Sequence, residues 1–273
     1  MSGSLIARKE FGDALRTRTL RLVSAVFALL VVGDAYLYTL QSYHTGSTAD
    51  VVLHFVPAAR ALVPLVGLAV GYRAVVGERA SGSIKILLGL PHSRCDVVRG
   101  KLLGRCVVVA LPLLASFALA AALVATQYGG FALVPFAGFV LLTLLLGIAF
   151  VALGVGVSAA TATPRRAAAA AVGAFALVEL FWGALVNLVG YVVTGSASMT
   201  YPLPAWAYFV QQLSPTGAYE GLVRALVSRG TVQLAGGGPA PAYLSPWVAL
   251  LVVLAWAAVP LAVGAWRFRN ADL

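Results

Sequence analysis

The stretch LVPFAGFVLLTLLLGIAFVALGVGVSAA, residues Leu133–Ala160, contains no charged side chain and only two hydroxyl groups, one on a threonine and one on a serine. About 17–25 apolar residues in a helix cross the hydrocarbon core of a membrane, so this stretch predicts a membrane-spanning helix. Gly147, Gly154, Gly156 and Ser158 recur along it. Small residues at such spacing let neighbouring helices pack closely in lipid.

Five further apolar runs lie on both sides of this stretch. They occupy Leu22–Leu40, Ala61–Val76, Cys106–Thr126, Ala167–Val193 and Pro246–Trp266. The second run becomes long enough to span when it is extended outward through Val56, with Arg60 reaching to the membrane interface. The 273-residue chain is 10% charged, whereas a soluble domain carries about 25% charged residues. The sequence therefore predicts an all-α integral membrane protein with six transmembrane helices.

The net charge of +10 is distributed unevenly between the two sides of the predicted bundle. All Lys and Arg residues except Arg60, Arg224 and Arg229 fall in segments that six spans would place on one side. Lys and Arg are enriched in cytoplasmic loops, so both termini are expected in the cytoplasm, with the chain in the cell membrane. Anionic lipid headgroups, rather than nucleic acid, are the expected partners of this charge.

Residues 4–20, SLIARKEFGDALRTRTL, form an amphipathic segment ahead of the first apolar run. Apolar side chains supply one side of it and Arg and Lys the other. A helix of this kind lies in the membrane interface rather than across the membrane. The alternative is a basic flank of the first span.

Three polar residues lie within the predicted spans, namely Asp34, Glu179 and Asn187. A charged side chain near the bilayer centre costs a few kcal/mol, so these residues should face protein or water rather than lipid. Either they line a path for ions or protons, or they pair with each other, with Arg60 or with neighbouring backbone.

The segment 194–245, between the fifth and sixth runs, is predicted to lie outside the cell. Its residues 203–213 are too short a run to cross the membrane, and we expect them to enter and leave it beside other helices. Residues Thr216–Ser228 predict a short amphipathic helix, in which Glu220 and Arg224 form an i,i+4 ion pair.

The segment 77–101, GERASGSIKILLGLPHSRCDVVRGK, is a charged island in an apolar chain. Its first six residues match a phosphate-binding loop, but the Lys and Ser/Thr that must follow are replaced by Ser83 and Ile84. The chain is therefore not expected to bind or hydrolyse ATP itself, and no enzyme activity is predicted for it.

The island instead predicts two short helices. Ser81 or Ser83 would cap the first, and Ser93–Asp96 has the pattern of a capping box at the start of the second. The first helix would expose an apolar ridge, and an exposed apolar surface of this kind promotes aggregation unless a partner covers it. We expect it to dock on a cytosolic protein; the alternative is a helix lying on lipid.

In their order, these features resemble the ABC-2 type permeases, the membrane subunits of a class of ATP-binding-cassette exporters. The matching stretches are IARKEFGDALRTRTL, the island, LSPTGAYEGL before the last span and the terminal RFRNADL, so the resemblance covers essentially the whole chain. Within the family, the chain is most similar to the permease of the nitrous-oxide-reductase maturation transporter and to archaeal relatives.

The resemblance implies a single transmembrane domain, 1–273, with an elbow helix at 4–20, a cytoplasmic coupling loop at 77–101 and external re-entrant helices within 194–245. It also implies two copies of a cytosolic ATPase subunit, which would bind Mg-ATP, and a second permease copy or a related permease. The residues implied in ATPase coupling are Glu78, Arg79, Ser81, Gly82, Ile84, Lys85, Leu87 and Leu88. Those implied in the external helices are Trp206, Ser214, Pro215, Tyr219, Glu220 and Arg224.

Two other functions remain open at this point. One is an ion-driven secondary transporter built around Glu179, and the other is a membrane scaffold of a maturation complex that transports nothing. No catalytic, cofactor-binding or metal-binding residues are predicted. The three His residues are dispersed over both sides, and Met199 is the only Met besides the first residue, so no soft-metal site is visible.

Overall fold

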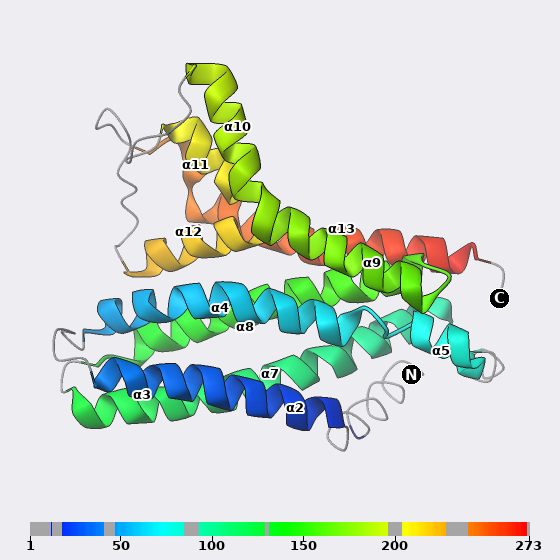
Figure 1. Cartoon of the computed structure of the whole chain (residues 1–273), viewed down its shortest axis with the longest axis horizontal. Coiled ribbons are helices and arrows are strands. Elements are labelled where there is room, and N and C mark those ends of the chain that lie inside the picture. Colours follow the sequence, from blue (N-terminus) through cyan, green and yellow to red (C-terminus); the bar gives the residue numbers. More distant parts are fainter. Residues whose placement is uncertain are drawn as a thin grey trace.

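The computed structural model describes Gly12 and residues 18–40, 47–84, 93–128, 131–195, 204–227 and 240–271. Within these residues every regular element is a helix. Six helices are long and apolar enough to cross a membrane, which confirms the predicted all-α architecture with six candidate spans. Figure 1 shows most of them running along one long axis.

The first four candidate spans follow one another with short connections. The first consists of α2 (Arg18–Phe27), a π-helical segment (Ala28–Val32) and α3 (Gly33–Thr39). The second joins α4 (Thr48–Gly71) to the short α5 (Val76–Ser81) through a turn. The third is α7 (Arg94–Gln127) and the fourth is α8 (Leu133–Ala160), which has the predicted bounds.

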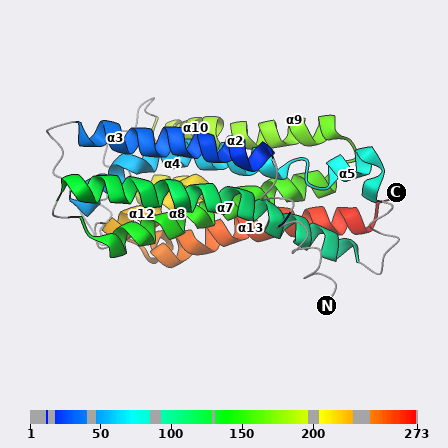
Figure 2. The same ribbon diagram turned by 90° about the horizontal axis from the view of Figure 1, so that it is seen from below.

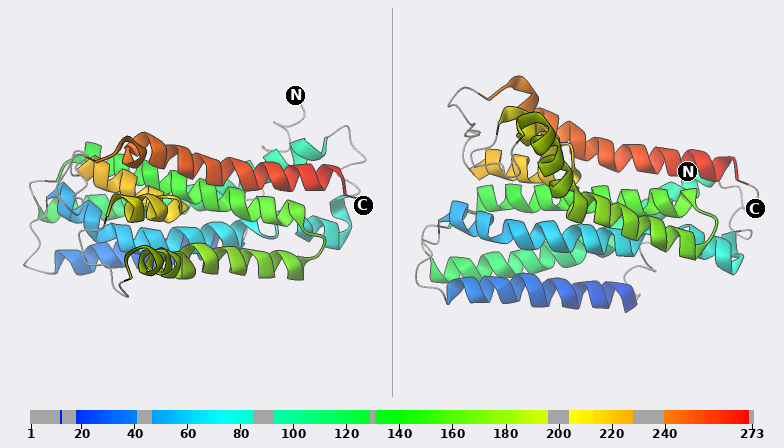
Figure 3. Two further views of the ribbon diagram at one scale, coloured as in Figure 1. Left: turned by 90° about the horizontal axis from the view of Figure 1, so that it is seen from above. Right: turned by 45° about the horizontal axis from the view of Figure 1, so that its top comes forward.

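The fifth candidate span consists of α9 (Pro164–Phe175), a π-helical segment (Ala176–Phe181) and α10 (Trp182–Thr194). Two short helices, α11 (Ala205–Gln212) and α12 (Pro215–Val227), precede the last span, α13 (Pro246–Arg269). Figures 1 and 3 show α9 lying along the bundle, while α10 leans away from it beside α11.

The predicted bounds of the second span are wrong at both ends. Helix α4 begins at Thr48, well before Val56, because Ser47 caps it by accepting the backbone N–H of Asp50 at 3.2 Å. Polar side chains in the first turns of α4 have partners on other elements. The Tyr38 hydroxyl, for example, donates to the Asp50 carboxylate at 2.9 Å. At the other end, α4 stops at Gly71 and α5 is a separate helix.

The capping box predicted at Ser93–Asp96 is confirmed at the start of α7. Ser93 Oγ accepts the backbone N–H of Asp96 at 3.1 Å, and the Asp96 carboxylate accepts the backbone N–H of Ser93 at 3.1 Å. The third helix therefore begins a dozen residues before the predicted Cys106. Its first turns carry the basic residues of the predicted second short helix, which is continuous with the third span.

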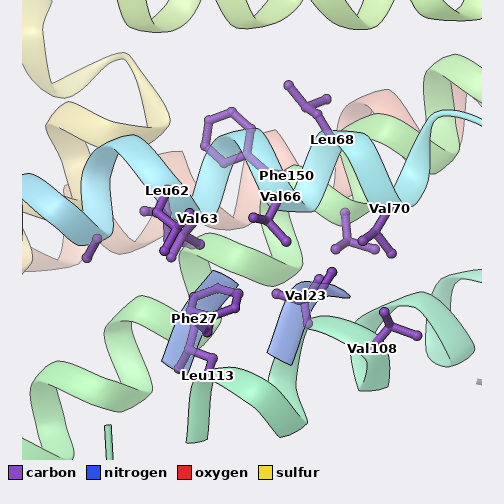
Figure 4. Packing of buried hydrophobic residues seen from close by; sticks show 14 of the residues in the cluster. Val23, Phe27, Leu62, Val63, Val66, Leu68, Val70, Val108, Leu113 and Phe150 are labelled. Atoms are coloured by element: carbon purple, nitrogen blue, oxygen red, sulfur yellow. The ribbon is translucent and has the colours of Figure 1, made fainter. Parts of the chain in front are cut away.

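Helix α8 forms the centre of the bundle, in contact with α4, α7, α12 and α13. Figure 2 shows α7 and α13 next to α8 from below. The core around it contains a chain of edge-to-face aromatic contacts among Phe55, Phe117, Phe136 and Phe139. Figure 4 shows Phe27 of α2 and Val63 of α4 pointing into the same apolar interior.

The predicted close packing through small residues is confirmed on two sides of α8. Gly156 lies against the backbone of Pro260 in α13, where a Cβ atom would collide with the Pro260 carbonyl. Gly154 lies against Gly71 of α4, with 3.0 Å between the position of an added Cβ and the Gly71 Cα. Both helices therefore approach α8 more closely than larger side chains would allow.

Candidate functional site

The first candidate site lies at one end of the bundle, where α5 is located. We name this end of the bundle the basic end. Helix α5 ends at Ser81, and Gly82 follows in the left-handed conformation at φ 75°. Ser81 is thus the last residue of α5 rather than the cap of a later helix; its hydroxyl donates to the Glu78 carbonyl at 3.2 Å. Ser83 and Ile84 are helical again. The coupling residues Lys85, Leu87 and Leu88 lie outside the described residues.

Glu78 points into the protein, where its carboxylate forms an ion pair with Lys101 of α7. Lys101 is only 5% exposed, and a buried ammonium group is tolerated only with such a partner. The second carboxylate oxygen of Glu78 is buried and has no hydrogen-bond partner among the described residues. This side chain therefore joins α5 to α7.

Arg79 and Arg94 hold the ring of Phe268, near the end of α13, between them. Each guanidinium carbon lies 5.7 Å from the ring centroid, a cation–π distance. Arg94 also donates to the carbonyl groups of Phe268, Arg269 and Ala271 at 2.7–2.9 Å. Arg79 donates to the Thr161 carbonyl at 3.1 Å. The two arginines thus connect α5 and α7 to the ends of α8 and α13.

Ser158 of α8 completes this set of contacts. Its buried hydroxyl accepts the backbone N–H groups of Val75 and Val76, each at 3.0 Å. From the sequence, Ser158 was predicted only as a small packing residue, and no role in a site was predicted for Lys101, Arg94 or Phe268. We call the six side chains that fix α5 to α7, α8 and α13 the basic-end clamp: Glu78, Arg79, Arg94, Lys101, Ser158 and Phe268.

The second candidate site lies half-way along the bundle and combines charges from three elements. Arg60 of α4 donates to Glu220 of α12 at 2.6 Å, and its Nε lies 3.8 Å from Glu179. Arg224 donates to the other oxygen of Glu220 at 3.1 Å, which confirms the predicted i,i+4 pair. The Arg60 side chain is 43% exposed despite these two partners, and its position relative to the membrane interface stays a prediction. We name these four residues the mid-span cluster.

The surroundings of the mid-span cluster are polar and incompletely bonded. Glu179 has a side chain only 7% exposed and belongs to the π-helical segment, a distortion that is frequent at functional sites. Its Oε1, the Thr216 hydroxyl and Nε2 of Gln212 are buried without hydrogen-bond partners among the described residues. Tyr219 donates to Thr143 of α8 at 2.9 Å, since the Thr143 hydroxyl itself donates to the Phe139 carbonyl.

The other polar residues of the predicted spans are not part of this cluster. Asp34 lies 3.2 Å from Nε2 of His54, which joins α3 to α4. Asn187 is exposed on α10. Of the three predicted residues, only Glu179 is therefore paired with Arg60, one of the alternatives that the sequence left open.

Helices α11 and α12 form a tight hairpin. Ser214 accepts the backbone N–H of Gly217 at 2.9 Å, and Pro215 is the first residue of α12. Trp206 packs with the buried Val186 of α10. Two indole groups bond the hairpin backbone at 3.0 Å: that of Trp182 to the Val210 carbonyl and that of Trp256 to the Leu213 carbonyl.

The comparison with known proteins agrees with this architecture. Residues 4–273 match the description "ABC-2 family transporter protein". The chain belongs to the ABC-2 transporter family. It is 34% identical to the "Probable ABC transporter permease protein NosY" of Pseudomonas aeruginosa and 31% identical to the protein of that name from Stutzerimonas stutzeri, with 97% of each chain covered in both cases.

As an ABC-2 permease, the chain is a membrane-spanning component of an ABC transporter, with six helices that can cross the membrane. Permeases of this kind are generally not catalytic themselves and in general imply an ATPase partner. Among the described residues, no three His, Cys, Asp or Glu side chains gather where they could hold a metal ion. The polar chemistry of the two candidate sites, the basic-end clamp and the mid-span cluster, consists of ion pairs and hydrogen bonds between helices.

Proposed function

We propose that this chain is the permease subunit of an ABC exporter, in which ATP hydrolysis by a separate cytosolic ATPase moves a substrate across the cell membrane. The observation that carries the proposal is the basic-end clamp. It joins the short helix α5 to α7 through Glu78 and Lys101, to α8 through the Val76 N–H and Ser158, and to α13 through Arg79 and the Phe268 ring. A displacement of α5 would therefore be passed to three spans, as a coupling element requires.

In this proposal the ATPase docks on the segment that begins with α5. Lys85, Leu87 and Leu88 would supply the docking face, together with Ser81 and Gly82. Ile84 is only 2% exposed and would support this face from the core. Glu78 and Arg79 would not contact the ATPase. They would hold α5 against the bundle, since their charged groups bond to α7, to the residue after α8 and to α13. Closure of two ATPase subunits around Mg-ATP would push on this segment and tilt the attached helices.

The proposed assembly contains two ATPase subunits and two permease subunits, either identical or related. Residues 1–273 would form one transmembrane domain with an interfacial elbow helix at 4–20 and a coupling loop at 77–101. The basic end would face the cytoplasm, with both termini, because Arg and Lys are retained on that side. The segment 194–245, which contains α11 and α12, would then cap the external side as re-entrant helices.

The test is co-purification of the tagged permease with its ATPase from membranes. Leu87→Asp and Leu88→Asp are expected to reduce the retained ATPase at least tenfold, because a charge replaces an apolar anchor in a docking groove. Ala162→Asp is the matched control, since Ala162 is exposed at the same end, on the connection between α8 and α9. Full retention of the ATPase by both leucine variants would contradict the docking proposal.

The mid-span cluster favours a second candidate, an ion-driven secondary transporter. Ionisable side chains inside a membrane bundle often mark ion or proton pathways, and Glu179 is nearly buried beside Arg60. Reconstitution in vesicles separates the candidates. Transport that needs ATP and the ATPase supports the exporter, whereas transport driven by an ion gradient alone and lost in Glu179→Gln supports the carrier. A scaffold would bind the ATPase and transport under neither condition.

A further inference from the structure

The buried face of α7 carries two cations at the basic end, Lys101 and Arg105, one helical turn apart. Val98 and Val108 lie on the same face and are at most 2% exposed. Nε of Arg105 is buried without a hydrogen-bond partner, and its side chain forms no ion pair within the part of the chain that the structure describes. A charge in such surroundings is costly unless it is paired.

Glu78 of α5 is the carboxylate that serves this face. Its Oε1 atom is bonded to Lys101. Its Oε2 atom is buried and has no hydrogen-bond partner among the described residues. Because an ionised carboxylate can accept on both oxygens, Glu78 retains an oxygen that can accept from a second cation. At this end of α7, one acid therefore stands against two cations.

Helix geometry places Arg105 deeper in the bundle than Lys101, on the same side of α7. The helix begins at the basic end, with Arg94. Four residues of helix correspond to about 6 Å at 1.5 Å per residue. The Cα–Cβ bonds of a helix tilt toward its N-terminus, so its side chains point back along the axis. The Arg105 side chain is therefore directed toward the turn at which Glu78 is bonded.

Helix α5 is attached in a way that permits Glu78 to shift. The helix has only six residues, Val76–Ser81, and lies at the edge of the bundle (Figure 1). Its beginning is fixed by Ser158, which accepts two backbone N–H groups there. Its other end passes into Gly82, in the left-handed conformation. A push on the segment after Gly82 would turn α5 about the Ser158 contact and carry Glu78 along α7.

We propose that Glu78 exchanges Lys101 for Arg105 when the ATPase displaces α5 toward the interior of the bundle. The inference rests on the proposed coupling function of α5. One cation is paired and one is unpaired in each position, so the two positions are similar in free energy and a modest push decides between them. Shifts of one helical turn between packed elements are a recognised form of two-state switching. Arg105 is thus the positioning residue for the displaced state.

The first test is thermal unfolding of the full-length permease without the ATPase. Lys101→Met should lower the midpoint only moderately, because Glu78 can bond to Arg105. Arg105→Met alone should change little, since Glu78 stays on Lys101. The variant K101M/R105M leaves Glu78 with neither cation, so its loss should be roughly twice the sum of the two single losses, as expected for coupled neighbours. The control is K101M/R99M, which removes an exposed arginine of the same helix and should be additive.

Additive losses in K101M/R105M would overturn the proposal, because they would show that Arg105 cannot take over Glu78. A Lys101→Met chain that does not fold, while K101M/E78Q does, would overturn it for the same reason. The variant K101M/E78Q removes both charges and therefore shows whether methionine fits at position 101.

The second test measures the displacement in the complex with the ATPase. Nitroxide labels are placed on Ala80→Cys of α5 and Leu103→Cys of α7, both exposed positions, with Cys95 and Cys106 replaced by Ser. A non-hydrolysable ATP analogue should shorten the distance between the labels by several ångströms, and Arg105→Met should abolish this change. Absence of the ATPase from the complex would contradict the proposed function itself. A retained ATPase, with the same label distances or the same change in both chains, would overturn only the exchange of partners.

Discussion

Among single residues, Glu78 belongs to the segment proposed to dock the ATPase, yet its side chain points into its own protein. Its sequence position suggests contact with a partner subunit, but its carboxylate is bonded to Lys101, 23 positions along the chain. Removal of one member of a buried ion pair leaves the other charge without compensation, which is more costly than removal of both. Loss of ATPase binding in a Glu78 variant would therefore report on folding as well as docking.

We expect Glu78→Ala to destabilise the permease by about 3 kcal/mol because it strands the Lys101 ammonium group. The double variant with Glu78→Gln and Lys101→Met should recover most of this loss. The midpoint of thermal unfolding in detergent measures both effects. Equal stability of Glu78→Ala and the native chain would show that the pair contributes nothing to the fold.

Arg60 is the second residue whose chemistry can be tested directly, since it bonds two acids on different elements. Lysine carries the same charge but presents it as a single compact group, so it cannot reproduce the fork of a guanidinium. We expect Arg60→Met to lower the unfolding midpoint by several degrees and to abolish transport, with Arg60→Lys intermediate in both measurements. If Arg60→Met transported normally, the mid-span cluster would have no role in function.

Among the helices, the crossing of α8 and α13 depends on backbone contact rather than on side-chain interdigitation. Gly156 and Gly264 face each other there, and an added Cβ atom at either position would enter the opposite backbone. No rotamer change can relieve such a collision, so the helices themselves must separate. Such a separation would also displace Phe268, a member of the basic-end clamp, because it lies one turn beyond Gly264 on α13.

We expect Gly156→Ala to cost about 1–3 kcal/mol, the usual range for overpacking. Gly173→Ala in α9 is the matched control, because nothing lies within 4 Å of its added Cβ atom. That change should be neutral or slightly stabilising, since Ala favours a helix over Gly. Unfolding midpoints of the two variants in the same detergent give the comparison, and equal losses in both would contradict the close-crossing account.

For the whole molecule, the parts that could be predicted from sequence are those governed by local pattern. The apolar run Leu133–Ala160 and the capping box at Ser93–Asp96 depend on near neighbours, and both are confirmed. The start of α4 was missed because its polar residues have partners on another helix: Asp50 accepts a hydrogen bond from Tyr38, and His54 lies 3.2 Å from Asp34. Ser158 and Lys101 were missed for the same reason, since their partners are set by helix packing. The elbow helix and the docking face of the coupling loop stay predictions.

The bonds between Arg94 and the end of α13 also have a consequence for biosynthesis. Arg94 and Phe268 are 174 positions apart, so a ribosome adding about 5–20 residues per second needs roughly 9–35 s to go from one to the other. During that interval the segment proposed to receive the ATPase has no Phe268 to hold it. A nascent or truncated chain would thus offer an unfinished docking surface, and only a permease translated through its last span would be accepted into the transporter.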